Sequence, residues 1–70
     1  MIVFFLKDST DGRIDGIIIS QASTKQDIIQ VIQKAKENPD YTLRDLLKVL
    51  PKDCSLHLKK DIAIDTIYYQ

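Results

Sequence analysis

The segment from residue 42 to 58 (TLRDLLKVLPKDCSLHL) is the part of the sequence that most narrowly limits the fold. We expect Thr42 and Asp45 to form a capping box at the start of a helix. Pro51 ends that helix, because proline has no backbone N–H to donate. The pattern then becomes alternating, which predicts a half-buried strand over residues 55–59. Four leucines have the i, i+3, i+4, i+7 spacing of one α-helical face: Leu43, Leu46, Leu47 and Leu50.

This spacing puts Leu47 in the middle of the leucine stripe and predicts that it anchors the helix in the core. The whole segment, L-x-x-L-L-x-x-L-P-x-D-x-x-L, resembles a recurring helix–turn–strand in small uncharacterised bacterial and phage proteins. The resemblance implies a local fold and a mobile-element origin, but no chemistry and no site residues. The residues that carry it are Thr42, Leu43, Leu46, Leu47, Leu50, Pro51, Asp53 and Leu56.

The N-terminal part predicts a β-hairpin. Residues 1–7 are a continuous apolar run too short for a helix, which indicates a central strand buried on both faces. Residues 8–12 (DSTDG) are typical of a turn, and a second strand over residues 13–20 follows. If Asp8 closes the loop against Arg13, Phe4 lies opposite Ile17, and Phe5 lies opposite Gly16.

A longer helix is expected over residues 24–36, capped by Ser23 with Gln26 or by Thr24 with Asp27. The last strand is expected over residues 62–69. Its isoleucines change face halfway, so either both faces are covered or a bulge near Asp65 re-aims the end. Together these elements predict one α+β domain over residues 1–70, with an antiparallel hairpin, two helices and a C-terminal strand or hairpin (ββααββ).

Composition narrows the function classes. Lysine and arginine together number 10, as do aspartate and glutamate, so there is no basic excess for nucleic acid or anionic lipid. No stretch approaches the roughly 20 apolar residues that cross a bilayer. We therefore expect a cytoplasmic, non-enzymatic protein without cofactor or metal.

Two sets of residues are candidates for a catalytic or metal-binding site. Cys54 and His57 are three residues apart, which sends their side chains to opposite faces of a strand and argues against a catalytic pair. Asp8, Asp11 and Asp15 surround the hairpin turn, but their spacing does not match a calcium loop, and turn formation explains them better.

The clearest functional signal is an excess of apolar surface. Two helices cover only one face of a four-stranded sheet, and the first strand is apolar on both of its faces. A small monomer rarely leaves such a patch uncovered, so either the helices split across both faces or a partner covers the second face. We expect a self-associating interaction module, a homodimer, or else a module that binds another protein. The expected interface residues are Met1, Val3, Phe5 and Ile18.

A small nucleic-acid-binding regulator is the alternative. It would use phosphate contacts from lysines and base stacking on tyrosines at one end of the sheet. Aspartates lie among these lysines and weaken this interpretation. The residues concerned are Lys48, Lys52, Lys59, Lys60, Tyr68 and Tyr69.

Overall fold

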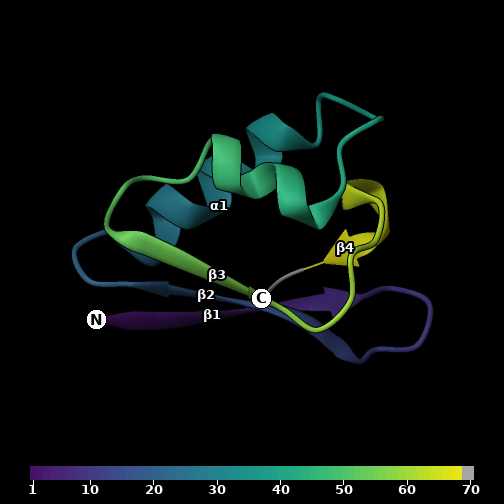
Figure 1. Cartoon of the computed structure of the whole chain (residues 1–70), viewed down its shortest axis with the longest axis horizontal. Coiled ribbons are helices and arrows are strands. Elements are labelled where there is room, and N and C mark those ends of the chain that lie inside the picture. Colours follow the sequence, from purple (N-terminus) through teal and green to yellow (C-terminus); the bar gives the residue numbers. More distant parts are fainter. Residues whose placement is uncertain (69–70) are drawn as a thin grey trace.

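The structure is a computed structural model that describes residues 1–68. Four strands form one antiparallel sheet in the order β3-β2-β1-β4. The α-helix α1 and the 3-10 helix η1 lie together over one face of this sheet (Figure 1). The elements are β1 (Ile2–Asp8), β2 (Ile14–Ser20), α1 (Lys25–Ala35), η1 (Leu43–Lys48), β3 (Cys54–Leu58), the 3-10 turn η2 (Ile64–Thr66) and β4 (Ile67–Tyr68).

The β1–β2 hairpin closes where the sequence predicts it, but a bulge shifts its register. The N–H of Asp8 donates to the C=O of Arg13 at 2.9 Å, which is the predicted closure. One pair further along, the register shifts and Leu6 pairs with Gly16, so Asp15 is the extra residue. A one-residue insertion reverses the faces of all the β2 side chains that follow it.

The predicted cross-strand pairs are therefore wrong by one residue. Phe4 lies opposite Ile18 instead of Ile17, and Phe5 lies opposite Ile17 instead of Gly16. The faces of β1 are as expected, whereas those of β2 are exchanged. Ile18, which was expected on the open face, is fully buried beneath the helices.

The core lies between the sheet and the two helices. Gly16 lets this layer close tightly, because a Cβ there would meet Leu6 Cδ1 at 3.3 Å and Leu58 Cδ2 at 3.4 Å. The buried apolar side chains are Phe4, Leu6, Ile18, Ile28, Ile32, Ala35, Leu43, Leu46, Ile64 and Ile67. β1 is a central strand, as predicted, although only one of its faces is covered.

Helix α1 forms as predicted and uses the second of the two capping options. The N–H of Thr24 donates to Asp27 Oδ2 at 2.9 Å, and the N–H of Asp27 donates to Thr24 Oγ1 at 3.2 Å. This reciprocal pair satisfies donors that a helix start otherwise leaves free. The helix presents Ile28, Ile32 and Ala35 to the core.

The predicted second α-helix is a 3-10 helix, and the prediction for Leu47 is wrong. The Asp45 carboxylate accepts the N–H of Thr42 at 2.9 Å, so the expected cap is present. A 3-10 helix has 3.0 residues per turn, so residues three apart share a face and the fourth rotates away. Leu43 and Leu46 are accordingly fully buried, whereas Leu47 is 58% exposed.

The C-terminal part is shorter and more irregular than a strand over residues 62–69. The turn η2 gives Ile64 and Ile67 the three-residue spacing that buries both, which resolves the change of face in the sequence. β4 pairs with β1 at Lys7 and Asp8 only, among the described residues. Since β3 pairs with β2 at the other edge of the sheet, β3 and β4 do not form a hairpin.

Asp53 ties the start of β3 to the turn between β2 and α1. Its Oδ2 atom accepts hydrogen bonds from Ser20 Oγ (2.6 Å) and from the N–H groups of Ala22 and Ser23 (2.9 Å each). These donors, led by the Ser20 hydroxyl, hold the pKa of the Asp53 carboxyl well below its usual range. The contact fixes where β3 joins the sheet.

Candidate functional site

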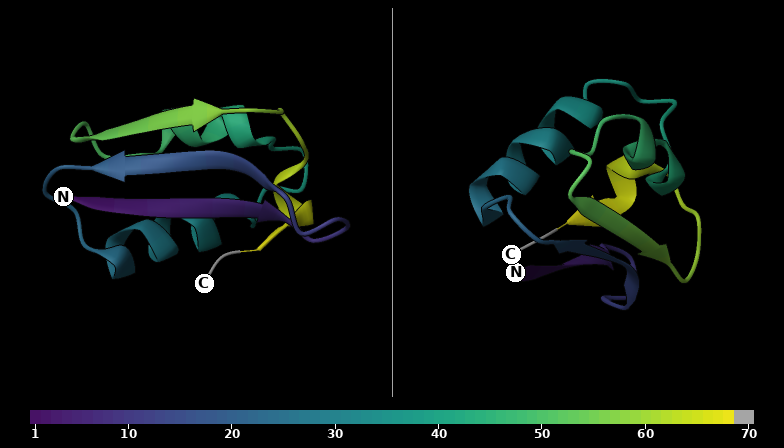
Figure 2. Two further views of the ribbon diagram at one scale, coloured as in Figure 1. Left: turned by 90° about the horizontal axis from the view of Figure 1, so that it is seen from below. Right: turned by 60° about the vertical axis from the view of Figure 1, so that its left-hand side comes forward.

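The face of the sheet opposite the helices is uncovered by any other described segment (Figure 2, left). We call the outward-pointing side chains of β1, β2 and β3 the open face. Its β1 members are Val3 and Phe5, which are 46% and 45% exposed, and the half-buried Lys7 at the end of the strand; Met1 beside them is 79% exposed. The other members are Ile17, Ile19, Ser55 and His57.

Strand pairing arranges the open face in rows across the sheet. Val3 lies opposite Ile19, which in turn lies opposite Ser55. The next row joins Phe5 to Ile17 and then to His57. Directly opposed side chains in a sheet are about 4.5–5.5 Å apart at Cβ, so each row is a continuous contact surface. The centre of the open face is thus apolar and its β3 edge is polar.

Charge is sparse on the open face. None of its members listed above carries a carboxylate, and its titratable side chains are His57 and Lys7. Lys7 lies at the bulged end of β1, where it pairs with Ile14 and with Tyr68 of β4. A surface of this composition carries little charge that would repel a copy of itself.

The structure places three of the four predicted interface residues on the open side of the sheet and corrects the position of the fourth. Met1, Val3 and Phe5 lie on the open side, but Ile18 belongs to the core. Ile17 and Ile19, its neighbours along β2, lie on the open face instead. Gly16 within a strand pattern was the available signal, because an isolated strand glycine often marks a bulge.

Cys54 and His57 lie on opposite faces of β3, as their spacing predicts. Cys54 is half-buried on the helix side, with its Sγ 3.8 Å from Ser23 Oγ. The His57 ring is exposed on the open face, with Nε2 3.2 Å from Ser55 Oγ. The thiol and the imidazole therefore do not form a nucleophile–base pair.

The lysines of the alternative hypothesis do not form one patch. Lys52 precedes β3, whereas Lys59 and Lys60 follow it, so a strand about 17 Å long separates them. Tyr68 lies on β4, at the far edge of the sheet from β3. Tyr69, the remaining member of the predicted patch, lies outside the described residues.

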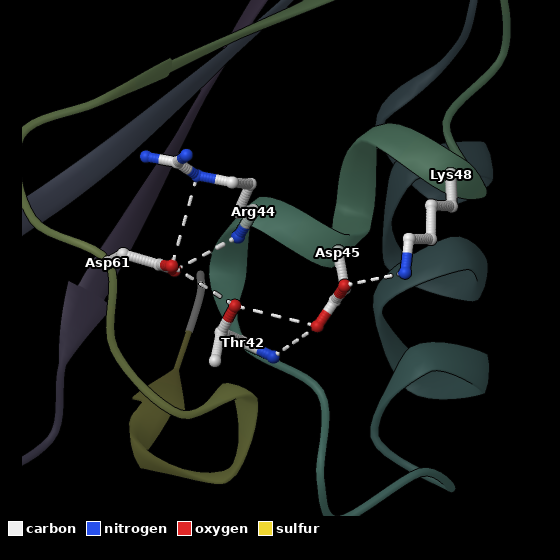
Figure 3. A network of polar contacts seen from close by, with 5 residues as sticks. All are labelled: Thr42, Arg44, Asp45, Lys48 and Asp61. Atoms are coloured by element: carbon white, nitrogen blue, oxygen red, sulfur yellow. Dashed lines mark hydrogen bonds and ion pairs between the residues drawn. The ribbon is translucent and has the colours of Figure 1, made fainter.

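Lys48 is already engaged in a polar network at the start of η1 (Figure 3). Its Nζ lies 3.0 Å from Asp45 Oδ1, and this carboxylate raises the pKa of the Lys48 ammonium group. In the same network, Asp61 accepts hydrogen bonds from the Arg44 N–H (3.1 Å) and the Thr42 hydroxyl (3.2 Å). The Asp61 contacts hold η1 against the segment that follows β3. The ion pair with Asp45 partly offsets the charge of Lys48.

The structure brings together three carboxylates of the β1–β2 hairpin. One oxygen each of Asp8, Asp11 and Asp15 lies within 4.8 Å of the others. A set of oxygen ligands without histidine or cysteine suits a hard cation such as Ca²⁺ or Mg²⁺, not zinc.

Comparison with known proteins gave no relatives. The chain matches no protein-family model, no curated protein and no solved structure. The resemblance of residues 42–58 to small bacterial and phage proteins therefore stays a prediction. Among residues 1–68, no helix has the length and apolar character that crossing a membrane requires.

Proposed function

We propose that this protein is a non-enzymatic interaction module that forms a homodimer through its open face. The observation that carries the proposal is the pair of apolar rows, Val3–Ile19 and Phe5–Ile17, on a sheet face that no helix covers. Two such faces packed together at about 10 Å would make a second core between two sheets.

A second copy is the occupant that the charges favour. In a two-fold dimer the same patch meets itself, so a patch that carries charge of one sign is repelled by its copy, whereas an apolar patch is not. The open face carries no carboxylate, and its basic groups are the His57 imidazole and the Lys7 ammonium at the end of β1, away from the two apolar rows. Polar Ser55 and His57 at the β3 edge would form the rim, with the apolar rows at the centre.

The size of the face sets the expected strength. Three strands about 4.8 Å apart and seven residues of about 3.3 Å each give a flat footprint of roughly 330 Å². Standard interfaces bury about 800 Å² of accessible surface per partner, so we expect a weak dimer. A dissociation constant of roughly 10⁻⁶–10⁻⁴ M fits an interface of that class.

Nucleic-acid binding has less support from the same structure. Lys52 and Lys59 lie at opposite ends of β3, and Lys48 is paired with Asp45. A gel shift with RNA or single-stranded DNA that weakens with added salt would support nucleic-acid binding over the dimer proposal.

Phe5→Glu tests the dimer. Sedimentation equilibrium over roughly 10 µM to 1 mM should show wild type approaching about 16 kDa, twice the 8.0 kDa chain. Phe5→Glu should stay near 8.0 kDa with an unchanged circular dichroism spectrum. A buried aromatic anchor typically contributes about 2 kcal/mol or more, so its loss should weaken the dimer by at least about 30-fold.

Leu47→Glu is the matched control, because Leu47 is also an exposed apolar residue but lies on η1, on the other side of the molecule. This variant should dimerise like wild type. Monomeric wild type at the highest concentration would contradict the proposal. Loss of the dimer in Leu47→Glu but not in Phe5→Glu would move the interface to the helical side.

A further inference from the structure

The β1–β2 hairpin holds a buried carboxylate, Asp15, whose side chain interacts with another carboxyl group, that of Asp8, and keeps one oxygen without a hydrogen-bond partner. Asp15 is 6% exposed, and its Oδ2 atom has no hydrogen-bond partner. A buried, charged oxygen without a hydrogen-bond partner lowers the free energy of unfolding, and such atoms are rare in folded proteins. The oxygens of Asp8 and Asp11 lie within 4.8 Å of the Asp15 carboxylate, so it faces two further acidic groups.

The bulge is what directs Asp15 into this cluster. As the extra residue of β2, Asp15 leaves the ladder register, and its C=O accepts the N–H groups of Lys59 (2.8 Å) and Lys60 (3.3 Å). Its backbone is thus satisfied by the segment after β3. Its side chain alone stays without a hydrogen-bond donor at Oδ2.

The turn positions Asp8 and Asp11 through hydrogen bonds to one oxygen of each carboxylate. Asp8 Oδ1 accepts the N–H and the hydroxyl of Thr10, at 2.8 and 2.6 Å. Asp11 Oδ1 accepts the N–H of Arg13 at 2.9 Å. Each residue therefore uses Oδ1 for the turn, and its Oδ2 atom takes part in none of these bonds.

A nearby lysine or arginine does not neutralise the cluster by direct contact. The ion pairs among residues 1–68 are Lys48–Asp45 and Arg44–Asp61, and neither involves the hairpin. The Lys60 ammonium acts on Asp8 only through space, after the Thr10 hydrogen bonds that chiefly lower the pKa of the Asp8 carboxyl.

We propose that Asp8, Asp11 and Asp15 bind a hard divalent cation, Ca²⁺ in preference to Mg²⁺. Oxygens on opposite sides of one Ca²⁺ ion lie about 4.6–5.2 Å apart, which accommodates the observed cluster. Mg²⁺ demands near-ideal octahedral geometry, keeps several waters and usually binds through one or two carboxylates, so a set of three carboxylates favours Ca²⁺. Carboxylate oxygens and water would complete the shell of Ca²⁺, with Asp11 at the solvent side.

Calorimetric titration of the chelator-treated full chain with CaCl₂ or MgCl₂ tests this site, with thermal melts at constant ionic strength. We expect one Ca²⁺ per chain with a dissociation constant on the order of 10⁻⁴–10⁻³ M, as for other weak calcium sites. At about ten to a hundred times that constant, the melting temperature should rise by roughly 5–20 °C. Asp15→Asn, which keeps the side-chain shape, should weaken Ca²⁺ binding at least about tenfold.

Asp40→Asn is the matched control, because Asp40 is an exposed aspartate outside the cluster. It should bind Ca²⁺ as wild type does. If Asp15→Asn does not fold, Asp11→Asn serves in its place, since Asp11 is exposed and its substitution leaves the core intact. No saturable binding to wild type, or equal binding by wild type and the cluster variants, would overturn the proposal. Mg²⁺ binding as tight as Ca²⁺ binding would overturn the preference for Ca²⁺.

Discussion

Leu46→Ala separates the 3-10 helix of this structure from the α-helix that the sequence suggests. Leu46 is fully buried and Leu47 is 58% exposed, although both belong to the same predicted apolar stripe. In an α-helix the two would share the core face, whereas the 3-10 spacing groups Leu46 with Leu43 and turns Leu47 outward. The cost of truncating each leucine therefore reports on the helix type.

The magnitude follows from the burial of Leu46. Burying a leucine side chain contributes about 1.5–3 kcal/mol, and Ala keeps only its first carbon. The cavity left behind adds about 24 cal/mol per Å³, or roughly 1 kcal/mol if about 40 Å³ stays unfilled. We expect a total loss of about 3 kcal/mol, which lowers the melting temperature by roughly 12–24 °C in a domain of this size.

Urea denaturation followed by circular dichroism measures both variants. Leu46→Ala should lower the midpoint strongly at an unchanged m-value, and Leu47→Ala should change the free energy of unfolding by less than about 0.5 kcal/mol. If Leu46→Ala unfolds completely, Leu46→Val removes one carbon and keeps the comparison measurable. A loss for Leu47→Ala comparable with that for Leu46→Ala would refute the 3-10 assignment and support the α-helical register.

Two further predictions concern β3 and the turn it contacts. Since folding lowers the pKa of Asp53, this residue stabilises the protein at pH values above its ordinary pKa of 3.8, and that contribution is lost progressively as the pH falls below it. The free energy of unfolding of Asp53→Asn should therefore be lower than that of wild type at pH 7 and should change less as the pH falls. Parallel curves of unfolding free energy against pH for the two proteins would show that the Ser20 and Ser23 hydrogen bonds do not act on the Asp53 charge. The double variant Cys54→Ser with His57→Gln should keep the fold and should not abolish any activity of the protein, because the two side chains point to opposite faces of β3. An enzymatic turnover that wild type shows and the folded double variant lacks would contradict the conclusion that they form no catalytic pair.

Local sequence patterns predicted most of the secondary structure. The Thr24–Asp27 box, the Asp8–Arg13 closure and the alternating strand at residues 54–58 all depend on neighbours in the chain. Such contacts are available to sequence reasoning because their geometry is set within a few residues.

The features that the sequence did not reveal depend on insertions and on helix type. A single extra residue at Asp15 exchanges the faces of β2, buries Ile18 and exposes Ile17 to the open face. The same bulge brings Asp15 to the carboxylates of the turn; the sequence groups these three aspartates, but their spacing matches no calcium loop and does not show that they converge. The choice between 3-10 and α-helical geometry near Leu47 rests on how the segment packs on the sheet, and periodicity alone leaves both open.

Contacts between two copies of the chain test the proposed open-face dimer most directly. An isotope-filtered nuclear Overhauser experiment on a mixture of labelled and unlabelled wild-type chains detects only contacts that cross between copies. We expect cross-copy signals from the Phe5 ring to methyl groups of Val3, Ile17 or Ile19, because the two apolar rows would face each other. Cross-copy signals confined to Leu47, or none at millimolar concentration, would contradict the account.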